Sequence, residues 1–134
     1  MSDTRNPPHV DMLRSPLGRA RGLGSAHAGA AHWWGLRLTS LALVPLTVWF
    51  VWNVIRLSGA SREDVAIWLG SPMVLALMLA LIITTFHHMA SGLQIVIEDY
   101  VHHENTKLAG VLLIKALCVI MALACIVSVL RVGL

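Results

Sequence analysis

Two adjacent histidines, His87 and His88, lie inside a long apolar segment of this sequence. An ionisable side chain is costly to insert at membrane depth, so it is usually retained because the protein uses it. Neutral imidazole is also a common axial ligand of haem iron. The pair therefore indicates a haem-binding helix. The alternative is a histidine that hydrogen-bonds a neighbouring helix of a membrane bundle.

The two histidines cannot both face one narrow partner, because adjacent side chains on a helix point about 100° apart. Gly92 lies four residues after His88, and Ser91 lies four residues after His87. A small residue one turn along the helix leaves space beside either ring for a flat macrocycle. Helical spacing alone therefore favours His88 only slightly.

No second histidine is expected within the membrane part of the chain. His27 and His32 precede or begin the first apolar segment, while His102 and His103 follow the second. A six-coordinate haem would then take its other axial ligand from another polypeptide. This predicts a hetero-oligomer that shares the cofactor.

Asp99 and Tyr100 follow the histidines at the expected end of the same helix. Tyrosine is enriched at membrane interfaces, and a carboxylate at a helix end is usually solvated, so both residues have ordinary structural explanations. Together they also suit a quinone site, in which the phenol hydrogen-bonds a carbonyl oxygen and the carboxylate positions a neighbouring cation or water.

Arg37 and Thr39 stand at the beginning of the first apolar segment. An arginine at this depth can extend to the lipid headgroups. If a haem is present, Arg37 could instead pair with a haem propionate.

The composition is that of a membrane protein. Of 134 residues, 57% are hydrophobic and only 13% are charged, whereas charged residues make up about a quarter of ordinary soluble domains. The mean hydropathy is +0.73. The net charge of +3 comes without a basic run containing interleaved aromatics, which argues against nucleic-acid binding. Cys118 and Cys125 are separated by roughly 10 Å along a helix, too far for a disulfide.

Three apolar segments predict an all-α integral membrane protein with three transmembrane helices, part of a multi-subunit helix bundle. Each segment exceeds the roughly 20 residues that cross a bilayer as a helix. The expected helices are residues 33–57, 72–97 and 108–130, within an anchor domain of residues 31–134 that follows a polar tail of residues 1–30. Pro45 should kink the first helix without ending it.

The distribution of arginine and lysine predicts the orientation. The tail carries four arginines and Arg37 adds a fifth, against two arginines around the first loop and one at the carboxyl end. We expect a bacterial inner-membrane protein with a cytoplasmic amino terminus and a periplasmic carboxyl terminus. The arginine-rich tail also suits a mitochondrial transit peptide, although its two aspartates, Asp3 and Asp11, argue against one.

The segment from His88 to Val101 resembles the small hydrophobic membrane-anchor protein of succinate dehydrogenase (respiratory complex II). The family motif reads approximately His-x(3)-Gly-x(2)-Gln-x(3)-Asp-Tyr-Val, and His88, Gly92, Gln94, Asp99 and Tyr100 represent it here. Gln94 lies one position earlier than in that pattern. The resemblance extends over about residues 31–134, and the Arg-x-Thr that opens the first helix belongs to it.

The resemblance implies that His88 is one axial ligand of the iron of haem b and that Tyr100 hydrogen-bonds ubiquinone, with Asp99 lining the same site. It places Arg37 near a haem propionate. Two departures matter: Glu98 replaces a threonine often found before Asp-Tyr, and His87 lies beside the ligand position. The spacing to Asp99 favours His88.

The implied partners are a flavoprotein subunit, an iron–sulfur subunit and a second membrane anchor of the cytochrome b type, which shares the haem. Electrons from succinate would pass through the soluble subunits to quinone at the membrane. The sequence has no flavin or nucleotide fingerprint, so we expect no activity of the chain alone. A fumarate reductase anchor and a non-redox assembly subunit are the alternatives.

Overall fold

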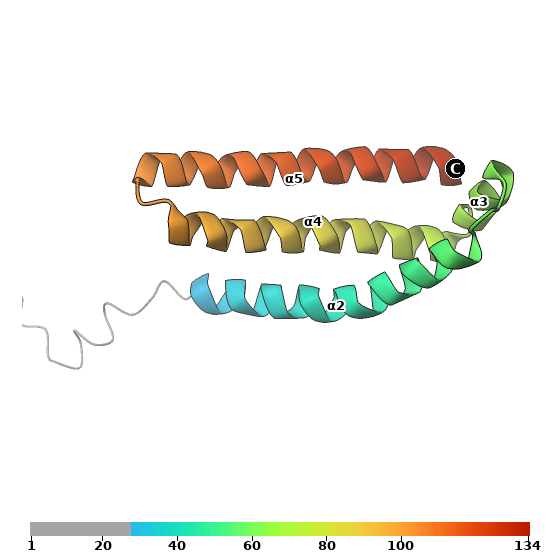
Figure 1. The fold of residues 1–134 in the computed structure, drawn as a ribbon, viewed down its shortest axis with the longest axis horizontal. Coiled ribbons are helices and arrows are strands. Elements are labelled where there is room, and N and C mark those ends of the chain that lie inside the picture. Colours follow the sequence, from blue (N-terminus) through green and yellow to red (C-terminus); the bar gives the residue numbers. More distant parts are fainter. Residues whose placement is uncertain (1–27) are drawn as a thin grey trace, which may run out of the picture. The chain divides into compact units, whose positions relative to one another are not determined.

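The computed structural model of the chain describes residues 28–134, and nearly all of the predicted polar tail lies outside them. It contains four helices, α2 (Ala28–Arg56), α3 (Arg62–Leu69), α4 (Pro72–Tyr100) and α5 (Glu104–Gly133), and no strand within the described residues (Figure 1). Three of the helices are long and apolar enough to span a membrane. The predicted all-α fold with three candidate spans is therefore confirmed.

Most ends of the three long helices lie outside the predicted bounds: α2 begins five residues earlier, α4 ends three residues later, and α5 is longer at both ends, whereas the end of α2 and the beginning of α4 agree with prediction to within one residue. The three helices contain 29, 29 and 30 residues, which is roughly 45 Å of helix against a hydrocarbon core of about 30 Å. Where the ends differ, the reason is that hydropathy marks only the part in lipid, whereas the helical backbone continues into less apolar residues. Pro72 begins α4, at a position where a helix needs no N–H from its first residue.

Few side chains of this subunit are buried by its own helices. Within the described residues, only Leu69, Leu81, Cys118 and Asn53 are buried, and most large apolar side chains on the long helices are exposed. Exposed apolar surface on this scale needs lipid or partner helices to cover it. The helices are therefore those of a membrane subunit and not of a water-soluble bundle.

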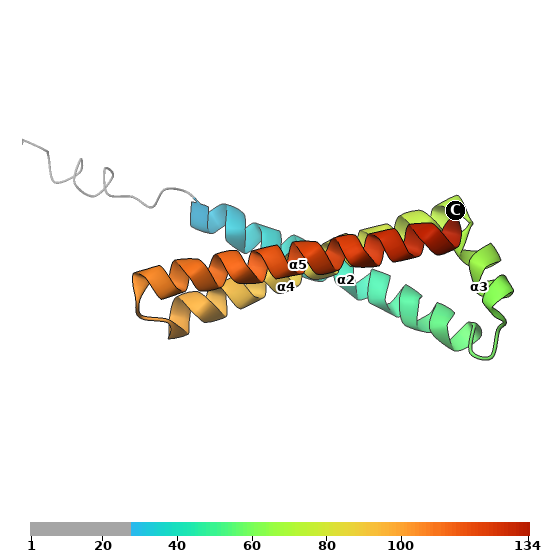
Figure 2. The ribbon, with the colours of Figure 1, turned by 90° about the horizontal axis from the view of Figure 1, so that it is seen from above.

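Helices α4 and α5 form an antiparallel hairpin, which Figures 1 and 2 show side by side. The connection is short, because α4 ends at Tyr100 and α5 begins at Glu104. Near this turn Gly110 lies close to Ile97, where an added Cβ would meet the isoleucine side chain at 3.5 Å. Cys118 is buried in α5, and both it and Cys125 are free thiols, as the spacing predicted.

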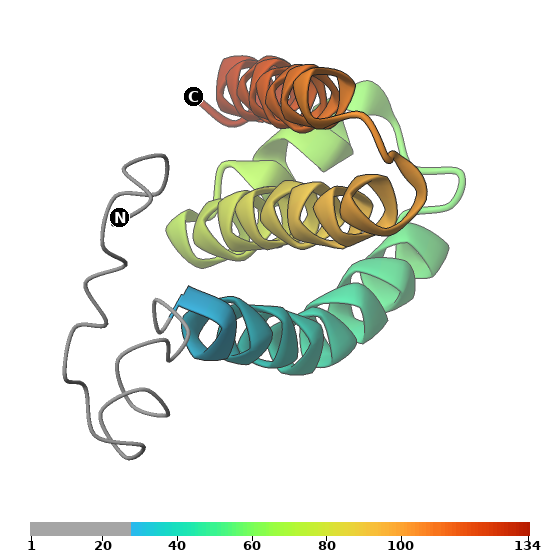
Figure 3. The same cartoon turned by 90° about the vertical axis from the view of Figure 1, so that its left-hand side faces the viewer.

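Helix α2 continues through Pro45, as predicted, and its axis bends partway along (Figure 1). Within residues 32–134, α4 lies between α2 and α5 (Figure 3). This middle helix carries both the histidine pair, His87 and His88, and the adjacent Asp99 and Tyr100.

The connection between α2 and α4 contains a helix that hydropathy did not predict. Helix α3 begins with a capping box, in which the Ser61 hydroxyl accepts from the Asp64 N–H and the Asp64 carboxylate accepts from Ser61. The hydrogen bond from the Ser61 hydroxyl, with that from its backbone N–H, lowers the pKa of the Asp64 carboxyl below its ordinary value. Trp68 then stacks on Trp49 of α2, with ring centroids 6.1 Å apart.

Helix α3 also contacts the end of α5 through a glycine. A Cβ added at Gly133 would lie 3.1 Å from the carbonyl oxygen of Leu69 and 3.3 Å from its Cγ. Leu69 is itself buried. The absence of a side chain at Gly133 therefore permits the close approach of the two helices.

Gly133→Ala is expected to destabilise the protein relative to Gly35→Ala. Both changes replace a helical glycine, but a Cβ at Gly35 would meet nothing within 4 Å. Overpacking against Leu69 should cost about 1–3 kcal/mol, which exceeds the gain of roughly 0.5–1 kcal/mol that alanine brings inside a helix. Thermal unfolding of the assembled complex in detergent measures the difference, and equal midpoints would contradict it.

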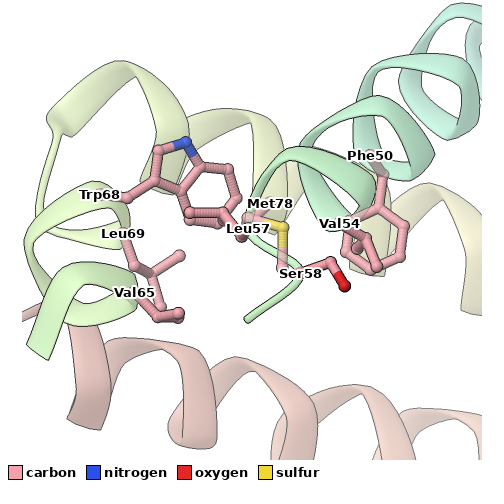
Figure 4. Close-up of a pocket in the computed structure, with 8 residues that line it drawn as sticks. All are labelled: Phe50, Val54, Leu57, Ser58, Val65, Trp68, Leu69 and Met78. Atoms are coloured by element: carbon pink, nitrogen blue, oxygen red, sulfur yellow. The ribbon is translucent and has the colours of Figure 1, made fainter. Parts of the chain in front are cut away.

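An apolar cavity of about 450 Å³ lies where the end of α2 meets α3 and the beginning of α4. Figure 4 shows its lining side chains, which are Phe50, Val54, Leu57, Ser58, Val65, Trp68, Leu69 and Met78. The lining contains no titratable group, and Tyr100 lies at the opposite end of α4 from Met78. This cavity is therefore separate from the residues that could carry redox chemistry.

Candidate functional site

His88 is half-buried on α4 and contacts α2 through a hydrogen bond. Its Nδ1 lies 2.9 Å from the hydroxyl oxygen of Thr39, a residue 49 positions earlier in the chain. His87, one residue before it, is exposed and has no such partner within the described residues. The fold thus distinguishes two histidines that helical spacing barely separated.

Thr39 is also bonded within its own helix. Its hydroxyl lies 2.8 Å from the Gly35 carbonyl oxygen and 3.0 Å from that of Leu36. The sequence placed Thr39 in a motif beside Arg37 but assigned it no role. Its pairing with His88 depends on how two helices dock, and no local pattern reports that.

His32 is a further polar side chain of α2 that the sequence left outside the site. Its Nε2 atom is shielded from solvent and has no hydrogen-bond partner within residues 28–134. Seven residues, or about two turns, separate His32 from Thr39, so both lie on the same face of α2. The seven-residue spacing from His32 to Thr39 is the feature of the sequence that could have grouped His32 with Thr39 on one helix face.

Arg37 is exposed, and its guanidinium carbon lies 5.1 Å from the centre of the Trp33 ring. The two residues are one helical turn apart, which allows the cation to stack on the indole face. Within residues 28–134, this stacking on Trp33 is the interaction that the structure gives the guanidinium.

Asp99 and Tyr100 are the last two residues of α4, and both are exposed. Tyr100 is 78% exposed, which is far more than an aromatic side chain packed inside a bundle would show. Twelve residues of helix separate Tyr100 from His88, a rise of roughly 18 Å. The structure therefore keeps the histidine and the Asp-Tyr pair at two levels of one helix and does not bring them into contact.

Gly92, one turn beyond His88, faces open space. A Cβ built there would meet no atom within 4 Å. Gln94, the next residue of the motif, donates from its amide to the Glu98 carboxylate at 2.6 Å. Gln94 is thus engaged along the helix, while the surface beside Gly92 is left uncovered by this subunit.

These features define a class of protein: a three-span membrane subunit that carries a partnered histidine in its central helix and an exposed phenol at that helix's end. Residues 12–125 match the family model described as succinate dehydrogenase/fumarate reductase transmembrane subunit. The chain therefore belongs to this family, and the resemblance noted from the His-to-Asp-Tyr segment is confirmed.

Individual relatives agree with this assignment. The succinate dehydrogenase hydrophobic membrane anchor subunit of Paracoccus denitrificans is 34% identical over 71% of this chain and 74% of its own length. The protein of the same name from Rickettsia bellii is 30% identical over 87% of this chain and 94% of its own. The succinate dehydrogenase membrane anchor subunit of Reclinomonas americana is 24% identical over 69% of this chain and 79% of its own length. No solved structure matches the chain.

Proposed function

We propose that the chain anchors a succinate:quinone oxidoreductase in the membrane, contributing one axial ligand of haem b and part of the ubiquinone-reduction site. The observation that carries the proposal is the half-buried His88, whose Nδ1 is engaged by Thr39. A metal-ligating histidine commonly has its second ring nitrogen fixed in this way. Such a partner makes His88 a better candidate than the exposed His87.

The residues around His88 fit a haem. With Nδ1 held by Thr39, Nε2 is the nitrogen available to iron, and the uncovered surface at Gly92 can accept the edge of a macrocycle. Arg37, two residues before Thr39 in α2, could extend to a haem propionate. When bound, haem b supplies a centre that accepts and returns one electron at a time. The second axial ligand would come from the partner anchor subunit.

Asp99 and Tyr100 would form this chain's part of the quinone site. The exposed Tyr100 hydroxyl can donate to a quinone carbonyl oxygen, where negative charge increases during reduction. Asp99 can position a neighbouring cation or water that supplies a proton. At the end of α4, both groups would lie at the membrane surface, within reach of a soluble subunit.

The proposed partners are the flavoprotein, the iron–sulfur protein and the cytochrome b type anchor, together with the lipid bilayer. The exposed apolar side chains of the three long helices supply the surface for lipid and the second anchor. The family description includes fumarate reductase, but the three relatives described above are named for succinate dehydrogenase. Succinate oxidation is therefore the direction we propose.

Purification of the affinity-tagged chain from its native membrane tests the proposal. We expect it to recover a succinate-oxidising complex that contains a flavoprotein and an iron–sulfur protein and shows a reduced-minus-oxidised spectrum of a b-type haem. A complex that reduces quinone but lacks this spectrum would reject the haem assignment. Recovery without any redox partner would favour a non-redox assembly subunit.

The topology gives a separate prediction. Three spans would put the two termini on opposite sides of the membrane, and the excess of arginine before α2 predicts a cytoplasmic amino terminus and hence a periplasmic carboxyl terminus. Alkaline phosphatase fused after Leu134 should be active, and green fluorescent protein at the same position should be dark after Sec-dependent export. The opposite result would contradict the proposed orientation.

A further inference from the structure

The hydroxyl of Thr39 lies within hydrogen-bonding distance of three polar atoms but has only one hydrogen to donate. Its oxygen lies 2.8 Å from the Gly35 carbonyl oxygen, 3.0 Å from the Leu36 carbonyl oxygen and 2.9 Å from His88 Nδ1. A hydroxyl has one hydrogen to donate and two lone pairs to accept with. The position of that hydrogen decides which nitrogen of His88 carries a proton.

Two arrangements are possible. If Thr39 donated to His88 Nδ1, its oxygen would stand close to two carbonyl oxygens with no hydrogen between them. If Thr39 donates to the carbonyl oxygens, its oxygen is free to accept from His88 Nδ1–H, and both groups are satisfied. The second arrangement makes an additional hydrogen bond and removes the repulsion between oxygens. The distances therefore favour His88 protonated at Nδ1, with the lone pair on Nε2.

We infer that Thr39 is a positioning residue that holds His88 in its Nδ1–H form and raises the electron donation of Nε2, thereby lowering the reduction potential of the haem. The inference rests on the proposed function of His88 as a haem ligand. A hydrogen bond from Nδ1–H increases the basicity of the ligating nitrogen, which stabilises ferric iron over ferrous iron. The donation from Thr39 to the Gly35 carbonyl polarises the hydroxyl and strengthens it as an acceptor.

The chain supplies a matched control in the same helix. Thr47 has the same local hydrogen bonds, at 2.7 Å to the Leu43 carbonyl oxygen and 3.0 Å to that of Val44, but it is exposed. Thr47→Val and Thr39→Val delete the same hydroxyl and the same bonds within α2. Only Thr39→Val also deletes the partner of His88.

The experiment is a potentiometric titration of the haem in the purified complex, together with its low-spin electron paramagnetic resonance spectrum. Thr39→Val should shift the midpoint potential upward and move the largest g value, because the ring loses both its acceptor and its fixed orientation. Thr39→Ser should restore wild-type values, and Thr47→Val should not depart from them. If Thr39→Val prevents assembly, Thr39→Ala removes the hydroxyl without placing a methyl group against the ring, and the same shift is expected.

An unchanged potential and g value in Thr39→Val or Thr39→Ala would overturn the role of Thr39. So would a shift of equal size in Thr47→Val, or a failure of Thr39→Ser to restore the potential. If His88→Ala abolishes the haem spectrum while the Thr39 variants are normal, the ligand assignment stands and only this inference fails. A wild-type complex without b-type haem would reject the proposed function and the inference with it.

Discussion

Replacement of His88 by alanine should remove most of the b-type haem absorbance of the assembled complex, whereas replacement of His87 should leave it nearly unchanged. His88 is half-buried with Nδ1 held by Thr39, while His87 points to the exposed side of α4. Alanine offers iron no ligand, so a six-coordinate low-spin haem cannot form at full occupancy. Reduced-minus-oxidised spectra, normalised to the flavin content of each preparation, measure the loss.

His87→Ala is the matched control, because it removes the same ring one position earlier in the same helix. An unchanged spectrum in His88→Ala would contradict the assignment of the axial ligand. Loss of the spectrum in His87→Ala alone would exchange the roles of the two residues. In that case the hydrogen bond to Thr39 would be an interhelical contact without a haem function.

Tyr100→Phe should reduce quinone reduction severalfold and leave the oxidation of succinate by an upstream artificial dye near normal. The change deletes one hydroxyl from a side chain that is 78% exposed, so the cost to packing is small. A hydrogen bond to a neutral carbonyl is worth about 0.5–1.5 kcal/mol, which corresponds to roughly twofold to tenfold in rate. The loss should be larger if the phenol stabilises charge on the reduced oxygen.

The two assays distinguish a quinone role from an assembly role. The dye accepts electrons before they reach the membrane, so it reports on the soluble subunits in the complex. Equal losses in both assays would mean that Tyr100 supports assembly. No loss in either assay would leave Tyr100 as an aromatic anchor at the membrane interface.

The amino-acid sequence by itself determined the class of fold. Three long apolar segments can only be helices in lipid, since the backbone has no water to bond there, and the structure has α2, α4 and α5 in these places. The continuation of α2 through Pro45 was also predictable, because apolar residues lie on both sides. The helix ends were predicted less well, because hydropathy follows the bilayer and not the hydrogen bonding of the backbone.

Helix α3 was not predicted from the sequence, for a different reason. Its eight residues are too few and too polar to be recognised by hydropathy, although Ser61 and Asp64 carry the signature of a capping box. An isolated helix of this length is marginal in water. Its stability comes from tertiary packing, through the stacking of Trp68 on Trp49 and the contact of Leu69 with Gly133.

For the candidate site too, some features could be predicted from the sequence and others depended on the tertiary structure. The motif spacing singled out His88, Asp99 and Tyr100 from the sequence, since these residues lie on one helix and their separation is local. Only the tertiary structure decided that His88 faces α2 while His87 does not, and that Thr39 is the partner of the ring. A hydrogen bond between residues 49 positions apart depends on the rotation and depth at which two helices dock. Side chains along the whole contact determine these quantities, and no single segment of sequence records them.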